Sequence, residues 1–187
     1  GSGTITVNVS ENAFIGSEQE LRLNTINAGG AVRIKTAAGI ASSTSSNGTN
    51  IESGDLILEA ASGAIGTSDH PIETSLLNNT SLTARARQDI YIVETNTMNV
   101  ETIYSQAGSI NLEARTGSIL DALNHGFTNL KSVEFVLTAP EGSIGSLSNP
   151  LEVDATGSAR SLTANAHSDI VITETTGNMY LNSVVST

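Results

Sequence analysis

The stretch that decides the fold is LILEAASGAIG at residues 56–66, which recurs as FVLTAPEGSIG at residues 135–145. The match continues through residues 71–73 and 150–152, 81–84 and 161–164, and 89–95 and 169–175. One inserted residue lengthens the offset between the copies before position 161. A tetrapeptide at 23–26, 100–103 and 181–184 carries the same period along the chain. Residues 1–187 thus hold about 2.3 copies of a unit of about 80 residues. We expect them to form a single segment, a piece of a longer repeat array.

A shorter period lies inside the long one. Its pattern is Leu-x-Ala, a short polar stretch and then Ile, and copies recur about every 25 residues apart from one longer step after Leu82. We therefore predict three coils of this length per long unit, with a bulging loop near 95–99 in the longer step. Residues 42–49 and 121–128 occupy one position of the long repeat but differ in sequence, which predicts surface loops. The anchors of the short period are Ile34, Leu58, Leu82, Leu112, Leu137 and Leu162.

Apolar residues alternate with polar ones inside each short unit, as Leu56, Leu58 and Ala60 show. Period two is the signature of β-strands, and Gly, Asn, Asp and Ser mark the corners between them. A propeller blade needs about 40–45 residues, and an immunoglobulin-like sandwich expects a core Trp. We therefore predict an all-β parallel β-helix (a solenoid) of about seven coils, each with three short strands. The alternative is a β-sandwich with accidental similarity. Zero Trp and 3 Phe suit a narrow interior.

Two coils, at residues 108–119 (GSINLEARTGSI) and 161–170 (SLTANAHSDI), resemble the repeats of filamentous haemagglutinin-type and other giant bacterial surface adhesins. The resemblance covers the whole chain as a pattern of Gly, Ile, Leu and Ala positions. It implies a right-handed parallel β-helix that is part of a secreted, extracellular shaft on a bacterial cell surface. Such shafts serve cell adhesion, cell–cell contact and biofilm formation. The implied partners are adjoining repeats of the same chain, surface glycans and neighbouring cells.

Composition excludes several classes of function. The net charge is −11, and the 8 basic residues are not clustered, which argues against a nucleic-acid partner. No run of 18 apolar residues is present, so we expect no membrane insertion. The absence of Cys excludes disulfides, thiol chemistry and Cys-based zinc sites.

The second hypothesis is a carbohydrate-binding or polysaccharide-cleaving β-helix. Such enzymes need clustered carboxylates, and Glu94 with Glu174 and Asp89 with Asp169 are equivalent pairs in the long repeat. Three coils separate the members of each pair, on the order of 14 Å, whereas catalytic carboxylates lie about 5–9.5 Å apart. We read both aspartates as turn residues that cap their own backbone. The prediction is no enzyme and no catalytic residue.

The remaining candidate residues do not form a recognisable metal or cofactor site in the sequence. His70, His125 and His167 lack a second ligand at metal spacing, so we predict surface histidines and no metal or cofactor site. Weak Ca²⁺ binding at acidic turns is kept as an alternative, and Tyr91 is expected to be an exposed strand residue, at most a weak sugar contact. Because the stack has open ends, we also expect the segment either to associate end to end or to be only marginally stable. Glycosylation sequons occur at Asn8, Asn47, Asn78 and Asn79.

Overall fold

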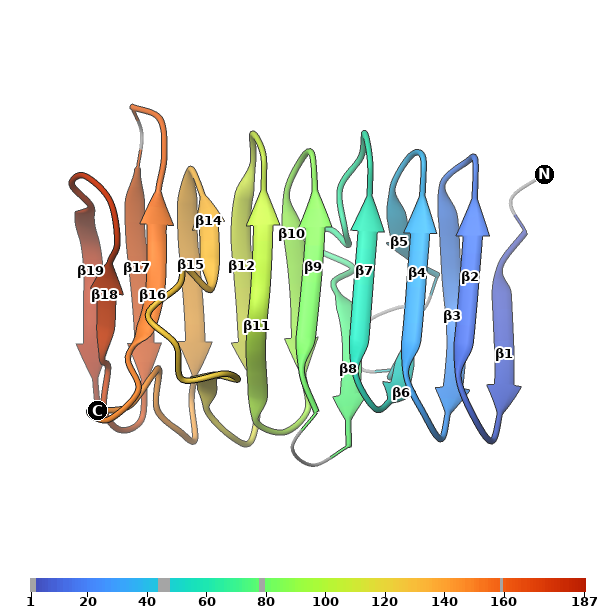
Figure 1. Cartoon of the computed structure of the whole chain (residues 1–187), viewed down its shortest axis with the longest axis horizontal. Coiled ribbons are helices and arrows are strands. Elements are labelled where there is room, and N and C mark those ends of the chain that lie inside the picture. Colours follow the sequence, from blue (N-terminus) through green and yellow to red (C-terminus); the bar gives the residue numbers. More distant parts are fainter. Residues whose placement is uncertain (1–2, 44–47, 78–79, 159) are drawn as a thin grey trace.

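The computed structural model describes residues 3–43, 48–77, 80–158 and 160–187. Its elements are all β-strands, and they wind into a solenoid of about eight turns spaced about 21 residues apart. In Figure 1 the strands of one sheet rise in front and those of the other descend behind, while the chain advances from right to left. This winding is right-handed. The predicted fold class is thus confirmed.

Two parallel sheets make the two faces of the solenoid. We call the ten-stranded sheet, which contains β1, sheet A, and the nine-stranded sheet, which contains β2, sheet B. Sheet A comprises β1 (Ile5–Val9), β3 (Leu21–Ala28), β5 (Ile40–Ser42), β6 (Ile51–Ser53), β8 (Ile72–Leu76), β10 (Ile90–Glu94), β12 (Ser109–Ala114), β15 (Glu134–Ala139), β17 (Ser161–Ala166) and β19 (Tyr180–Ser186). Sheet B comprises β2 (Ala13–Ser17), β4 (Val32–Thr36), β7 (Leu56–Ala60), β9 (Leu82–Ala86), β11 (Met98–Ser105), β13 (Ile119–Asp121), β14 (Leu130–Ser132), β16 (Leu151–Ala155) and β18 (Ile172–Glu174).

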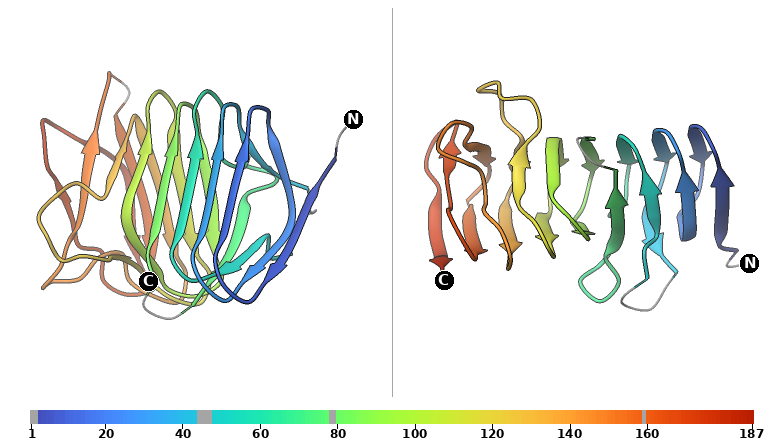
Figure 2. Two further views of the ribbon diagram at one scale, coloured as in Figure 1. Left: turned by 45° about the vertical axis from the view of Figure 1, so that its right-hand side comes forward. Right: turned by 90° about the horizontal axis from the view of Figure 1, so that it is seen from below.

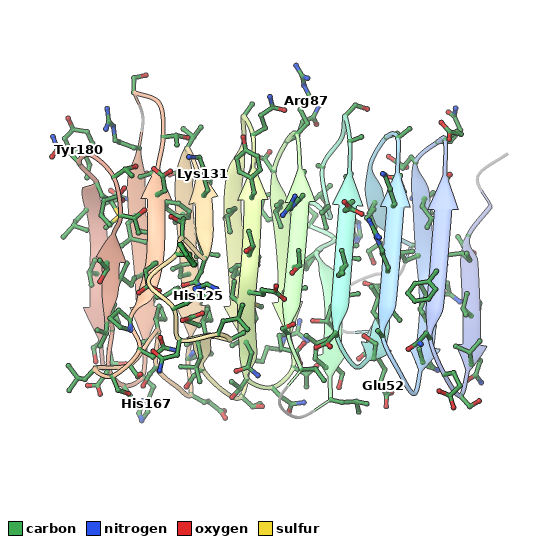
Figure 3. The ribbon with its side chains drawn as sticks, in the orientation of Figure 1. Glu52, Arg87, His125, Lys131, His167 and Tyr180 are labelled. Atoms are coloured by element: carbon green, nitrogen blue, oxygen red, sulfur yellow. The ribbon has the colours of Figure 1, made fainter. Side chains whose placement is uncertain are left out.

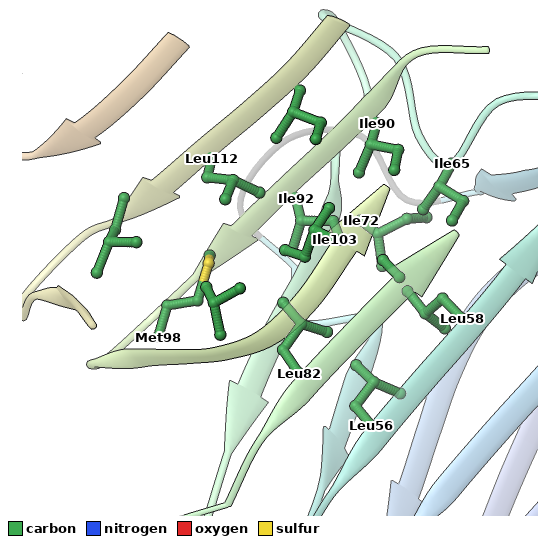
Figure 4. Packing of buried hydrophobic residues seen from close by; sticks show 14 of the residues in the cluster. Leu56, Leu58, Ile65, Ile72, Leu82, Ile90, Ile92, Met98, Ile103 and Leu112 are labelled. Carbon is green, nitrogen blue, oxygen red and sulfur yellow. The ribbon is translucent and has the colours of Figure 1, made fainter. Parts of the chain in front are cut away.

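The interior is a thin layer of stacked aliphatic side chains (Figure 4). Along sheet A one ladder runs through the whole protein, with each member paired to the equivalent residue of the next turn. The one aromatic residue among the largest fully buried side chains is Phe135. This confirms the narrow interior expected from the composition. The ladder consists of Leu21, Ile40, Ile65, Ile90, Ile110, Phe135, Leu162 and Leu181.

The number and length of the turns differ from the prediction. The sequence separation between stacked residues gives the length of a turn. This length varies from the short turn between Leu82 and Val100 to the long turn between Phe135 and Leu162. The turns number about eight rather than the predicted seven. Most turns have two strands instead of the predicted three. Two turns contain a third, three-residue strand, β5 or β13, and two other turns have a single-residue bridge at Ile65 or Ile144 in its place.

The long repeat spans three and a half turns, not three. Leu56 lies on β7 in sheet B, but its repeat equivalent Phe135 lies on β15 in sheet A. The Leu-x-Ala anchors therefore change sheets between Leu82 and Leu112, which explains why the step between these two anchors is the longest. The predicted bulging loop at 95–99 is wrong: residues 95–97 form a short corner, and Met98 is fully buried in the core.

The repeated tetrapeptide marks a β-bulge. The strand register shifts beside residues 24, 101 and 182, which are equivalent in the three copies. Each is an extra residue opposite its neighbouring strand, and such residues locally disrupt the ladder. Asn24 and Asn182 each donate a side-chain hydrogen bond to a threonine of the preceding turn, at 3.0 and 3.1 Å.

Loops project from both faces at repeat-equivalent places. Sheet A carries the segment between Ile65 and β8, and sheet B carries those between β13 and β14 and between Ile144 and β16 (Figures 1 and 2). Of the loop predicted at 121–128, Asp121 is the buried end of β13, and Leu123 and Phe127 are exposed in the segment that follows. Of the loop predicted at 42–49, Ser42 is the buried end of β5, and residues 44–47 lie outside the description. Gly66 and Gly145 begin the loops before β8 and β16 with φ of +68°. A Cβ at either position would collide with the carbonyl oxygen of the neighbouring turn, so only glycine fits.

Each end of the stack presents the edge strands of both sheets, β1 and β2 at one end and β18 and β19 at the other. On β19 the side chains of Tyr180, Leu181, Val184 and Val185 are exposed. Association of these edges with another copy stays a prediction from the sequence.

Candidate functional site

A groove of about 400 Å³ lies on the outer face of sheet A. Its floor is formed by outward side chains of β8, β10, β12 and β15, and the loop between Ile65 and β8 contributes Ser68, Asp69 and Pro71. Gly66 allows the chain to turn sharply away from the sheet at this point, so the loop stands beside the strands instead of continuing along them. The groove exists because this turn adds a projecting loop to an otherwise regular face.

An ion pair is built into the groove. The Arg115 guanidinium Nη1 lies 2.9 Å from Oε2 of Glu73, which is only 5% exposed, and Nε lies 3.7 Å from Glu113. The hydrogen bond with Glu73 raises the pKa of Arg115, and burial opposes this effect. The ion pair places the Glu73 carboxylate and the Arg115 guanidinium together at the groove wall.

Tyr91 provides the groove's aromatic surface. It is half-buried on the outer face of β10, between the turns that carry Glu73 and Asn111. Burial, followed by the negative charge of Asp89, raises the pKa of the Tyr91 phenol. The hydroxyl therefore stays protonated at neutral pH. Tyr91 is therefore less exposed than the sequence predicted, and it lines the groove.

The repeat-equivalent glutamates do not pair, because Glu94 lies in sheet A and Glu174 in sheet B. Each holds the end of a neighbouring strand instead. Glu94 accepts hydrogen bonds from the Leu76 backbone at 3.1 Å and from the Thr74 hydroxyl at 2.6 Å, and Glu174 accepts one from the Ala155 backbone at 3.1 Å. Burial raises the pKa of both carboxyls. Their role is structural, as expected from their separation.

The turn aspartates act between coils. Asp89 accepts hydrogen bonds from the Ser109 backbone at 2.7 Å and from its hydroxyl at 2.9 Å, one turn further on. Asp55 accepts one from the Ser81 backbone at 2.8 Å in the same way. The prediction that Asp89 caps its own backbone was therefore wrong, whereas Asp169 lies at the corner before Ile170, as the repeat requires.

The histidines lie apart from one another. His70 and His167 are exposed, as predicted, whereas His125 is half-buried and packs edge-on against Phe127 with ring centroids 4.9 Å apart (Figure 3). Within the described ranges, no group of three or more His, Asp or Glu side chains could hold a metal ion. Of the sequons, Asn8 is exposed on β1, and those at Asn47, Asn78 and Asn79 lie outside the described residues.

Sequence reasoning missed the groove residues Glu73 and Arg115 and two buried asparagines, Asn50 and Asn129. Arg115 and Glu73 are 42 residues apart and meet only because they lie two strands apart in sheet A. One signal was available: Pro-Ile-Glu at 71–73 recurs as Pro-Leu-Glu at 150–152. A glutamate kept in both copies beside a strand start indicated a fixed role.

Comparison of the chain with family models, curated proteins and solved structures gave no significant match. In the portion of the chain that the structure covers, no helix is long and apolar enough to cross a membrane.

Proposed function

We propose that this chain is a stalk module of a very large bacterial extracellular surface protein that mediates attachment or cell–cell contact. The observation that carries the proposal is the continuous interior ladder, which passes through successive repeat copies without interruption. In a solenoid each turn contacts only its neighbours, so added repeats lengthen the rod without changing its design. Because one long repeat spans three and a half turns, equivalent loops in successive copies project from opposite faces of the solenoid.

The proposal predicts a rod and a contact phenotype. Electron microscopy of the full-length protein should show a thin shaft that shortens when one long repeat unit is deleted. Cells that display the full-length protein should aggregate or attach, and cells that display only its terminal domains should not. A compact particle, or attachment that is unchanged when all the repeats are removed, would refute the stalk assignment.

Carbohydrate binding is the second candidate, and the groove on sheet A favours it. A half-buried tyrosine beside a fixed arginine, three carboxylates and one amide offers both an apolar ring face and hydrogen-bonding groups. Sugars present the complementary combination of C–H faces and hydroxyls. In the other copy of the long repeat, the position equivalent to Tyr91 is occupied by Val171.

A glycan array followed by titration tests this candidate. For any glycan that binds, Tyr91→Ala should weaken the affinity about tenfold, the usual contribution of one aromatic contact. Tyr104→Ala is the matched control, because Tyr104 is also a half-buried outward tyrosine but lies on β11 in sheet B. Equal loss in both variants, or no glycan bound, removes the groove as a sugar site.

A further inference from the structure

Two buried carboxylates lie beneath the loop between β13 and β14, which crosses the outer face of sheet B (Figure 1). Asp121 ends β13 and is 6% exposed, and Glu152 on β16 is 8% exposed. The side chains interact electrostatically, and burial, followed by the charge of Asp121, raises the pKa of Glu152. Two carboxyl groups are thus buried close enough to interact. Ionising both costs free energy unless a cation or hydrogen-bond donors offset their negative charges.

Hydrogen bonds satisfy only part of this pair. Oδ1 of Asp121 accepts from the Asn129 side chain at 2.7 Å and from the Leu123 backbone at 3.0 Å. Oδ2 of Asp121 and Oε2 of Glu152 are fully buried and have no partner. Buried polar atoms are almost always paired, so two unpartnered carboxylate oxygens on side chains that interact electrostatically require an explanation.

The pair of residues equivalent to this acidic pair is different in the other copy of the repeat. There the equivalent of Glu152 is Glu73, which pairs with Arg115, and the equivalent of Asp121 is Ser42. In sheet B a second acid replaces the serine. None of the ion pairs among the described residues reaches Asp121 or Glu152, and the position equivalent to Arg115 in this copy lies beyond residue 187. Among the described residues, the other titratable group that acts on Glu152 is His125 of the overlying loop.

We propose that Oδ2 of Asp121 and Oε2 of Glu152 bind a divalent cation, with Ca²⁺ as the best fit. Calcium takes six to eight oxygen ligands in flexible geometry and accepts carboxylates together with main-chain carbonyls and water. Two acidic ligands under a surface loop correspond to a weak site, with a dissociation constant of about 10⁻⁴–10⁻³ M, as in extracellular modules. This site is independent of the stalk and sugar proposals.

Thermal unfolding with calcium tests the site directly. At about 10 mM CaCl₂, pH 7, the Tm of the wild type should rise by about 3–6 °C, the effect expected for a ligand near ten times its dissociation constant, and it should increase further with the logarithm of the calcium concentration. Asp121→Ser, which installs the serine of the other copy, should abolish the rise, and so should Glu152→Gln. Glu52→Gln removes one exposed acid from β6 in sheet A and should leave the rise unchanged (Figure 3).

Three outcomes would overturn the proposal. One is a wild-type Tm that does not respond to calcium beyond the response to NaCl of equal ionic strength. A second is an equal calcium response in Asp121→Ser and the wild type. The third is a shared proton: calcium has no effect, but lowering the pH from 7 to 5 stabilises the wild type and not Asp121→Ser. The raised pKa of Glu152 gives this sign, since its contribution is present at acid pH and lost as the pH rises through the folded-state pKa.

Discussion

Replacing Asn129 with aspartate is expected to lower the free energy of unfolding by about 3–5 kcal/mol at pH 7. The Asn129 amide is fully buried, and its nitrogen donates to the carbonyls of Val100 and Glu101 and to Oδ1 of Asp121. Its oxygen accepts from the Glu152 backbone at 2.9 Å. The side chain thus satisfies carbonyls beside the β-bulge of β11. An aspartate keeps the acceptor but turns a donor into a negative oxygen that faces three acceptors.

Asn50→Asp is the matched control. Asn50 is equally buried and donates to the Leu23 and Asn24 carbonyls at the equivalent bulge of β3, while its oxygen accepts from the Glu73 backbone. No acid occupies the position of Asp121 in this copy, where Ser42 stands. The loss in the Asn50 variant should therefore be smaller than the loss in the Asn129 variant, by about 1 kcal/mol or more.

Urea denaturation followed by circular dichroism measures both losses. The deficit of Asn129→Asp should shrink as the pH falls, because burial and the nearby acid raise the folded-state pKa of the new carboxyl and protonation restores a donor. An Asn129 variant about as stable as the wild type, or identical losses at both positions, would show that the amide does not hold the bulge.

The parallel β-helix was predictable because the geometry of a β-strand produces a regular pattern in the sequence. Inward residues alternate with outward ones, and the recurrence of residues 56–66 at 135–145 placed equivalent corners at one constant offset. The span of three and a half turns per long repeat, which puts equivalent residues in opposite sheets, was not predictable from these residues. Leu58 and Leu137 face the same interior from opposite sheets, and an inward side chain gives no indication of the sheet to which it belongs.

The groove and the buried side-chain amides could not be predicted from the sequence for a related reason. Contacts between turns depend on the length of each turn, and the turn lengths vary with the projecting loops. The separation of Glu73 and Arg115 along the chain therefore did not suggest contact. Asn50 and Asn129 follow polar segments and resemble turn residues in sequence. Their burial becomes evident only when the bulges that they satisfy are known.

Disulfide trapping gives the second large prediction, an all-or-none outcome. In the structure Arg85 on β9 stacks on Tyr104 on β11, both facing outward in sheet B. Adjacent parallel strands lie about 4.8 Å apart, which falls within the Cα separations that a disulfide tolerates. In a solenoid with three coils per long repeat, Leu82 would instead stack on Leu112, and Arg85 on Arg115.

The measurement that tests the central claim most directly compares two double-cysteine variants under mild oxidation. The protein has no native Cys, so any cross-link arises from the introduced pair. The account predicts a rapid, near-complete intramolecular disulfide in Arg85→Cys/Tyr104→Cys and none in Arg85→Cys/Arg115→Cys, whose residues lie on opposite sheets. A disulfide in the second variant and none in the first would contradict the register of three and a half turns per repeat.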